Sequence, residues 1–96
     1  MDVLITYDID TTTPAGARRL QRVAHLCESY GQRVQDSVFE CRLSAAALQR
    51  LIVELGSRID VRFDSVNLYR FEGSLAAART SLGRHVEHEL GRPWVL

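Results

Sequence analysis

Asp8 is the residue whose type and position in this sequence best fit metal chemistry. It stands at the end of a short β-rich run and directly before a polar turn that leads into a helix. A carboxylate there can bind a hard divalent cation such as Mg²⁺, although strand-end aspartates also cap turns, and Asp10 competes for either role. One carboxylate is too few for a metal cage. Two copies of Asp8 brought together in a dimer would suffice, with water and phosphate as the other ligands.

The positive charge of the chain comes entirely from arginine. Twelve basic residues balance twelve acidic ones, and no lysine is present. A GC-rich genome produces such a composition, and so does a need for guanidinium groups that bind phosphate in a bidentate way. Arg18, Arg19 and Arg22 lie within two turns of the first expected helix, and Arg33 follows it. This cluster indicates either contact with nucleic-acid phosphates or a solvated face with salt bridges to glutamates.

Other reactive residue types form no recognisable site. Cys27 and Cys41 do not form a CxxC motif, so we expect neither a zinc ribbon nor a thioredoxin site. We expect two buried thiols instead. His85 and His88 have helical spacing but no third ligand. No GxGxxG or P-loop motif is present. The sequence therefore predicts neither a zinc site nor a nucleotide cofactor.

Length and composition favour one small cytoplasmic protein. The chain has 96 residues, of which 46% are hydrophobic and 25% charged, as in ordinary globular domains. The longest apolar run is a few residues, too short to span a membrane. The N-terminus lacks the basic region of a signal peptide. We therefore expect a cytoplasmic location without a membrane segment.

The elements that must position these residues follow a β-α-β-β-α-β order. Thr13 before Pro14 and Ser44 are expected to cap two helices, which Gly31 and Gly56 are expected to end. Stretches of β-rich or alternating composition surround the helices at 3–9, at 33–43 with a break at 36–37, and at 65–72. This order predicts an α+β ferredoxin-like fold, in which two helices cover one face of a four-stranded antiparallel sheet.

Both faces of the expected sheet are apolar, which predicts a homodimer. In the first strand Val3 and Ile5 alternate with Leu4, and in the last strand Leu68 alternates with Tyr69. The helices cover only one face, so the other is most simply buried against a second copy of the chain.

Residues 73–96 are expected to form a C-terminal tail outside a ferredoxin-like domain of residues 1–72. Residues 74–82 fit a short helix or a linker, and residues 84–90 alternate enough to form a fifth strand. The apolar end, Trp94-Val95-Leu96, is expected to dock on the partner subunit or on another protein.

Three segments together resemble the CRISPR-associated Cas-two family, the small partner in the CRISPR adaptation machinery. They are Tyr7-Asp8-Ile9, Gly16-Ala-Arg-Arg-Leu20, and the run from Gly31 to Glu40. The likeness extends from Val3 to about Phe71. Tyr-Asp-Ile alone carries no information, whereas this helix and hairpin at this spacing in so short a chain are specific.

The resemblance implies a homodimer in which Asp8 of each subunit faces the other and binds a divalent metal, usually magnesium. It also implies a C-terminal strand that often joins the sheet of the partner subunit, which the atypical residues 73–83 put in question. The further residues that it implies near this site, or in nucleic-acid binding, are Tyr7, Arg18 or Arg19, Arg33 and Phe39.

Two functions are compatible with this resemblance. In the first, Asp8 holds Mg²⁺ in an endonuclease that cleaves single-stranded RNA or double-stranded DNA. In the second, the dimer is a catalytically silent adaptor that binds the duplex spacer precursor through its arginines and bridges dimers of the CRISPR integrase. Physical chemistry slightly favours the adaptor. Two aspartates with no histidine, lysine or further carboxylate nearby provide few groups that could catalyse hydrolysis.

Overall fold

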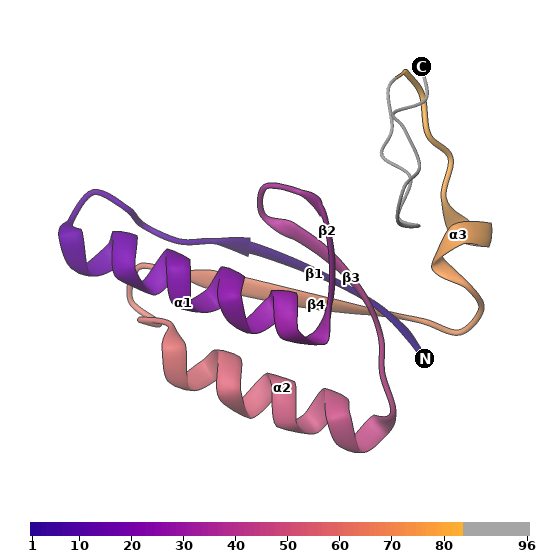
Figure 1. The fold of residues 1–96 in the computed structure, drawn as a ribbon, viewed down its shortest axis with the longest axis horizontal. Helices are drawn as coiled ribbons and strands as arrows, with labels where there is room; N and C mark the ends of the chain where they lie inside the picture. The colour runs from indigo at the N-terminus through magenta and orange to yellow at the C-terminus, as the bar shows by residue number, and fades with distance from the viewer. Residues whose placement is uncertain (84–96) are drawn as a thin grey trace.

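The computed structural model describes residues 1–83 of the chain. A four-stranded antiparallel sheet has the strand order β2-β3-β1-β4, so that β1 lies between β3 and β4 (Figure 1). The elements are β1 (Asp2–Asp8), α1 (Pro14–Tyr30), β2 (Gly31–Gln35), β3 (Val38–Arg42), α2 (Ala45–Arg58), β4 (Ser65–Phe71) and α3 (Leu75–Ala78). The predicted ferredoxin-like order β-α-β-β-α-β is therefore confirmed.

Helices α1 and α2 pack against one face of the sheet and enclose the core (Figure 1). Alternate side chains of β1 point to this face, where Val3 and Ile5 are fully buried. Ile5 lies opposite Phe39 of β3 and Leu68 of β4. From the helices, buried apolar side chains complete the core: Val23, Leu26, Cys27, Leu48, Leu51 and Leu55.

The helices begin where the sequence predicts, and one of them ends later. The hydroxyl of Thr13 accepts a hydrogen bond from the backbone N–H of Gly16 at 3.1 Å, and Ser44 caps α2 in the same way. The prediction that Gly56 ends α2 is wrong, since α2 continues to Arg58. There the side chains of Ser57 and Arg58 both donate to the carbonyl oxygen of Glu54, so bonds from residues beyond Gly56 hold the last turn without a glycine cap.

The predicted break at Asp36-Ser37 divides the 33–43 segment into β2 and β3, which pair as an antiparallel hairpin. The hairpin begins at Gly31, directly after α1 ends at Tyr30. Its register shifts between Arg33 and Gln35, which marks a bulge in the edge strand β2. The backbone N–H of Tyr7 donates to the carbonyl oxygen of Ser37 at 3.1 Å, so the hairpin turn is fixed to the end of β1.

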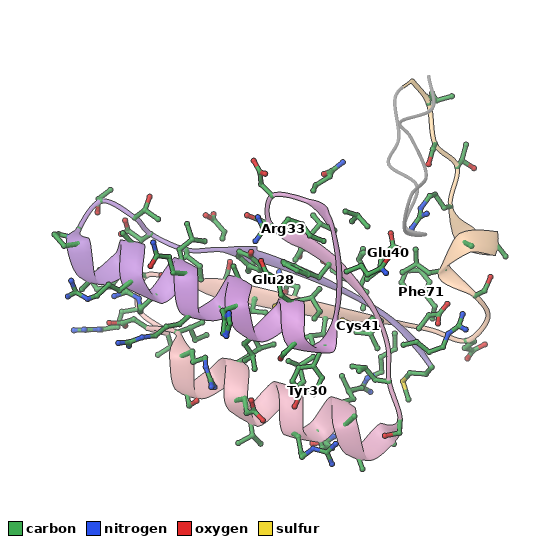
Figure 2. The ribbon with its side chains drawn as sticks, viewed as in Figure 1. Glu28, Tyr30, Arg33, Glu40, Cys41 and Phe71 are labelled. Atoms are coloured by element: carbon green, nitrogen blue, oxygen red, sulfur yellow. The ribbon has the colours of Figure 1, made fainter. Side chains whose placement is uncertain are left out.

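The second face of the sheet is partly covered by α3. The buried Leu75 anchors this helix, and its backbone N–H donates to the carboxylate of Asp2 at 2.8 Å. Arg79 forms an ion pair with Glu40, which lies near Phe71 in Figure 2. Apolar side chains of the sheet and of α3 line a groove of about 410 Å³ on this face, among them Leu4, Val34, Val38, Phe71, Leu75 and Ala78. Residues 74–82 thus contain a short helix followed by residues without regular secondary structure.

Several predictions fall outside the described residues: the fifth strand at 84–90, the pair His85 and His88, and the terminal Trp94-Val95-Leu96. The domain boundary after residue 72 also stays a prediction. No helix within residues 1–83 is long and apolar enough to cross a membrane.

Both cysteines are free and buried, as predicted, and we expect them to be unreactive in the folded protein. Burial raises the pKa of Cys27 to about 12 and that of Cys41 to about 11. Because the thiolate is the reactive form, iodoacetamide at about pH 8 should modify neither thiol in the native state and both in denaturing urea. Mass spectrometry of the two samples measures this. Rapid labelling of either cysteine without denaturant would contradict it.

Candidate metal and nucleic-acid site

Asp8 is an exposed carboxylate at the very end of β1. It pairs with Ser65 of β4 and shares its face of the sheet with Leu4 and Thr6, the face that α1 and α2 leave uncovered. Within residues 1–83, no hydrogen-bond donor or cation binds the Asp8 carboxylate. Its oxygen atoms are therefore available to a ligand from outside the described chain.

Asp10, the competing carboxylate, is occupied in the turn that follows. Its Oδ1 accepts hydrogen bonds from the backbone N–H and the hydroxyl of Thr12, at 2.9 and 2.7 Å. These bonds lower the pKa of Asp10. Asp10 thus acts as a turn cap, which leaves Asp8 as the carboxylate suited to a metal.

The loop after Asp8 is held by Asp64, a residue that sequence reasoning missed. The Asp64 side chain is fully buried and accepts from Arg19 Nε at 2.7 Å. It also accepts from the backbone N–H groups of Asp10 at 3.0 Å and Asp60 at 2.8 Å. The Arg19 hydrogen bond lowers the pKa of Asp64. One carboxylate therefore joins the β1–α1 loop, helix α1 and the α2–β4 loop.

We expect Asp64→Asn to destabilise the fold by about 2–3 kcal/mol at neutral pH, since hydrogen bonds to a charged group are lost. The folded-state pKa of Asp64 is depressed. The carboxylate therefore stabilises the fold above the unfolded-state pKa, about 3.9, and this contribution is lost as the pH falls through the folded value. Urea unfolding of both proteins from neutral to acidic pH measures the difference. A gap in unfolding free energy that stays constant down to the acid limit would contradict the assignment.

Tyr7, Phe39 and Arg33 form a second cluster, on the helix-covered side of the sheet. The rings of Tyr7 and Phe39 stack with centroids 6.2 Å apart, and Arg33 Cζ lies 5.1 Å from the Phe39 centroid. Arg33 also pairs with Glu28 of α1 at 3.2 Å (Figure 2). Because Tyr7 and Asp8 are neighbours on a strand, their side chains point to opposite faces. The cluster therefore supports the end of β1 and the β2–β3 hairpin from the face of the sheet opposite to Asp8.

The α1 arginines divide into two sets. Arg19 turns inward to Asp64, with its side chain only 17% exposed. Arg18 and Arg22 are exposed one turn apart, and together with Gln21 and His25 they line a shallow hollow on the outer side of α1. No acidic side chain within residues 1–83 forms an ion pair with Arg18 or Arg22. Among the described residues, then, nothing competes with an external anion for these two cations.

A metal site built by one protomer alone is not present in the described part of the chain. No group of three His, Cys, Asp or Glu side chains among residues 1–83 is placed to hold an ion. The oxygen chemistry of Asp8 nevertheless fits Mg²⁺, which proteins often hold through one or two carboxylates with water and phosphate. A second carboxylate would have to come from outside residues 1–83, and a second copy of the chain would supply another Asp8.

Fold and site together define a small ferredoxin-like α+β protein with an available strand-end carboxylate and available helix arginines. The family model described as CRISPR associated protein Cas2 matches residues 1–76. The chain therefore belongs to the Cas2 family.

Relatives and solved structures agree with this membership. The CRISPR-associated endoribonuclease Cas2 of Chlorobaculum tepidum is 48% identical over 89 residues, which cover 93% of this chain and 85% of the relative. The CRISPR-associated endonuclease Cas2 of Halalkalibacterium halodurans is 41% identical over 95 residues and 99% of both chains. Streptococcus pyogenes Cas2, crystallised at pH 6.5, superposes with a TM-score of 0.78 at 44% identity, over 86% of this chain and 100% of that one.

Proposed function

We propose that this protein is a Mg²⁺-dependent endonuclease of CRISPR adaptation, acting on single-stranded RNA or double-stranded DNA in the cytoplasm. The observation that carries the proposal is Asp8, whose carboxylate is exposed at a strand end without a partner among the described residues. Relatives named endoribonuclease and endonuclease support the same activity.

Among residues 1–83, Asp8 has no second metal ligand beside it, so the proposal includes a homodimer formed through the second face of the sheet. This face carries the apolar groove beside α3, and Asp8 lies on the same face. Burying the apolar side chains of this groove against an identical copy is favourable. A two-fold axis near the end of β1 would bring two Asp8 residues together.

In this dimer the two Asp8 carboxylates would hold the cation beside the scissile phosphate. When bound, Mg²⁺ supplies positive charge that activates water and stabilises a phosphoryl group under attack. Arg18 and Arg22, which are exposed and one turn apart, would bind flanking phosphates. Tyr7, Phe39 and the Arg19–Asp64 pair would hold the backbone around Asp8 in place.

A structural adaptor is the second candidate function, and the exposed Arg18 and Arg22 favour it. In this function the dimer neutralises phosphates of a duplex spacer precursor and bridges dimers of the CRISPR integrase, without cleaving. Such binding needs cations on a rigid surface and no metal. The apolar C-terminal residues Trp94-Val95-Leu96 would then contact the integrase.

A cleavage assay on labelled single-stranded RNA and duplex DNA, with Mg²⁺ and with EDTA, separates the two candidates. The endonuclease predicts cleavage that requires Mg²⁺, and the preferred substrate then identifies its class. Absence of cleavage together with tight, salt-sensitive duplex binding would reject the enzyme and support the adaptor. Absence of both cleavage and nucleic-acid binding would reject both candidates.

A further inference from the structure

The loop between α2 and β4 presents an aromatic ring to solvent. Phe63 is 58% exposed, and its neighbour Val61 is 81% exposed. The guanidinium carbon of Arg62 lies 5.1 Å from the centroid of the Phe63 ring, so the ring carries a cation over one of its faces. An exposed ring with a cation beside it offers a surface on which another planar group can stack.

The loop that carries this ring is held in one conformation by its acidic residues. Arg62 donates to Asp60 from Nε at 3.1 Å, from Nη2 at 2.9 Å and from its backbone N–H at 3.0 Å. These bonds lower the pKa of Asp60 to about 2, so both partners are charged at neutral pH. The backbone N–H groups of Phe63 and Asp64 donate to the Asp60 carbonyl oxygen at 3.0 and 2.8 Å. Phe63 is therefore presented by a preorganised loop.

The backbone of the residue that carries the ring is near that of Asp8. Asp8 pairs with Ser65 across β1 and β4, and Phe63 precedes Ser65 by two residues. The Cα atoms of Asp8 and Phe63 are thus at most about 13 Å apart, given strand spacing and chain geometry. The bond from the Asp10 N–H to Asp64, 3.0 Å long, fixes the two loops to each other.

We propose that Phe63 and Arg62 form a stacking platform for an unpaired nucleobase of a single strand whose backbone passes Asp8. The inference rests on the proposed contact with nucleic acid and specifies the form of the ligand. Bases stack on exposed aromatic rings whatever their identity, and the guanidinium hydrogens that Asp60 does not accept can bind a phosphate of the same strand. A ring beside a cation fits a nucleotide better than it fits an apolar protein surface.

The test measures binding in EDTA, so that cleavage plays no part. The probes are a single-stranded RNA and a DNA of the same sequence, each with an internal 2-aminopurine, and a duplex DNA. Phe63→Leu removes the ring and keeps an apolar side chain. We expect it to weaken single-strand binding about 5- to 100-fold and to abolish the 2-aminopurine quenching that stacking produces. Duplex affinity should change less than about twofold, because a paired base does not need the platform.

Two matched variants control for other effects of the substitution. Phe63→Tyr keeps the ring and should retain both affinity and quenching. Val61→Ala removes exposed apolar surface from the same loop and should bind like the wild type. Circular dichroism of each variant confirms folding, which is expected to be normal because both side chains are mostly exposed.

The outcomes distinguish this inference from the proposed function. If Phe63→Leu binds single strands as tightly as the wild type, the platform is refuted, and the loop is better explained as a protein contact. Equal losses in Phe63→Leu and Val61→Ala would refute it too, since the ring would then have no specific role. A wild-type protein that binds duplex but no single strand overturns the platform alone. A wild type that binds no nucleic acid overturns the proposed function.

Discussion

Asp8→Asn should reduce Mg²⁺-dependent cleavage by about 100-fold or more, because a metal contributes several kcal/mol of charge stabilisation that this carboxylate would secure. Asparagine keeps the size of the side chain and one oxygen ligand while removing the negative charge. The substitution should not destabilise the fold, since the Asp8 side chain is exposed and its carboxylate has no hydrogen-bond or ion-pair partner within residues 1–83. Initial cleavage rates at saturating Mg²⁺, with a thermal melt of each protein, measure both expectations.

The control for Asp8→Asn is Asp10→Asn, which changes a nearby carboxylate that caps its own turn. We expect it to lower stability slightly and to leave most of the cleavage. If both variants lose cleavage equally, the carboxylates act through the shape of the loop and not through metal binding. Cleavage that survives Asp8→Asn would assign the activity to another site or to a contaminant.

Mixing wild-type and Asp8→Asn subunits tests whether the site needs one carboxylate or two. If both are needed, activity after random re-association should fall with the square of the wild-type fraction. If each subunit acts alone, the decrease should be linear. A linear decrease would contradict the shared metal site while leaving Asp8 itself as a ligand.

The fold could be predicted because its signals are local. Thr13 and Ser44 cap helices through hydroxyl groups within three residues, and strand alternation depends only on neighbouring residues. The end of α2 at Arg58 could not be predicted, because side-chain bonds from Ser57 and Arg58 to Glu54 hold the helix together beyond Gly56. A local signal shows where a helix can end, and competition between caps decides where it does.

The site was predicted less completely because its contacts link distant parts of the chain. Asp8 could be located from its place at the end of a strand. Arg19 and Asp64, in contrast, are 45 residues apart, and nothing local indicates that this arginine turns inward while Arg18 and Arg22 stay exposed.

Gly16→Ala should destabilise the protein strongly, although alanine favours helices over glycine by about 1 kcal/mol. A Cβ atom at Gly16 would lie 1.8 Å from the carbonyl oxygen of Asp10 and 2.9 Å from its carbonyl carbon. Both atoms belong to the backbone of the β1–α1 loop, so a side-chain rotation cannot relieve the clash. We expect a loss of about 3 kcal/mol or more, at the upper end of overpacking costs or beyond. Urea unfolding measures it.

Gly56→Ala is the matched control, because it makes the same change in a helix where nothing lies within 4 Å of the new Cβ. It should stabilise the protein by about 0.5–1 kcal/mol, through the lower backbone entropy of alanine in the unfolded chain. Opposite signs for the two substitutions would show that α1 packs directly onto the loop that follows Asp8. If Gly16→Ala also stabilised the fold, that close packing would be wrong, and with it the rigid support that we assign to Asp8.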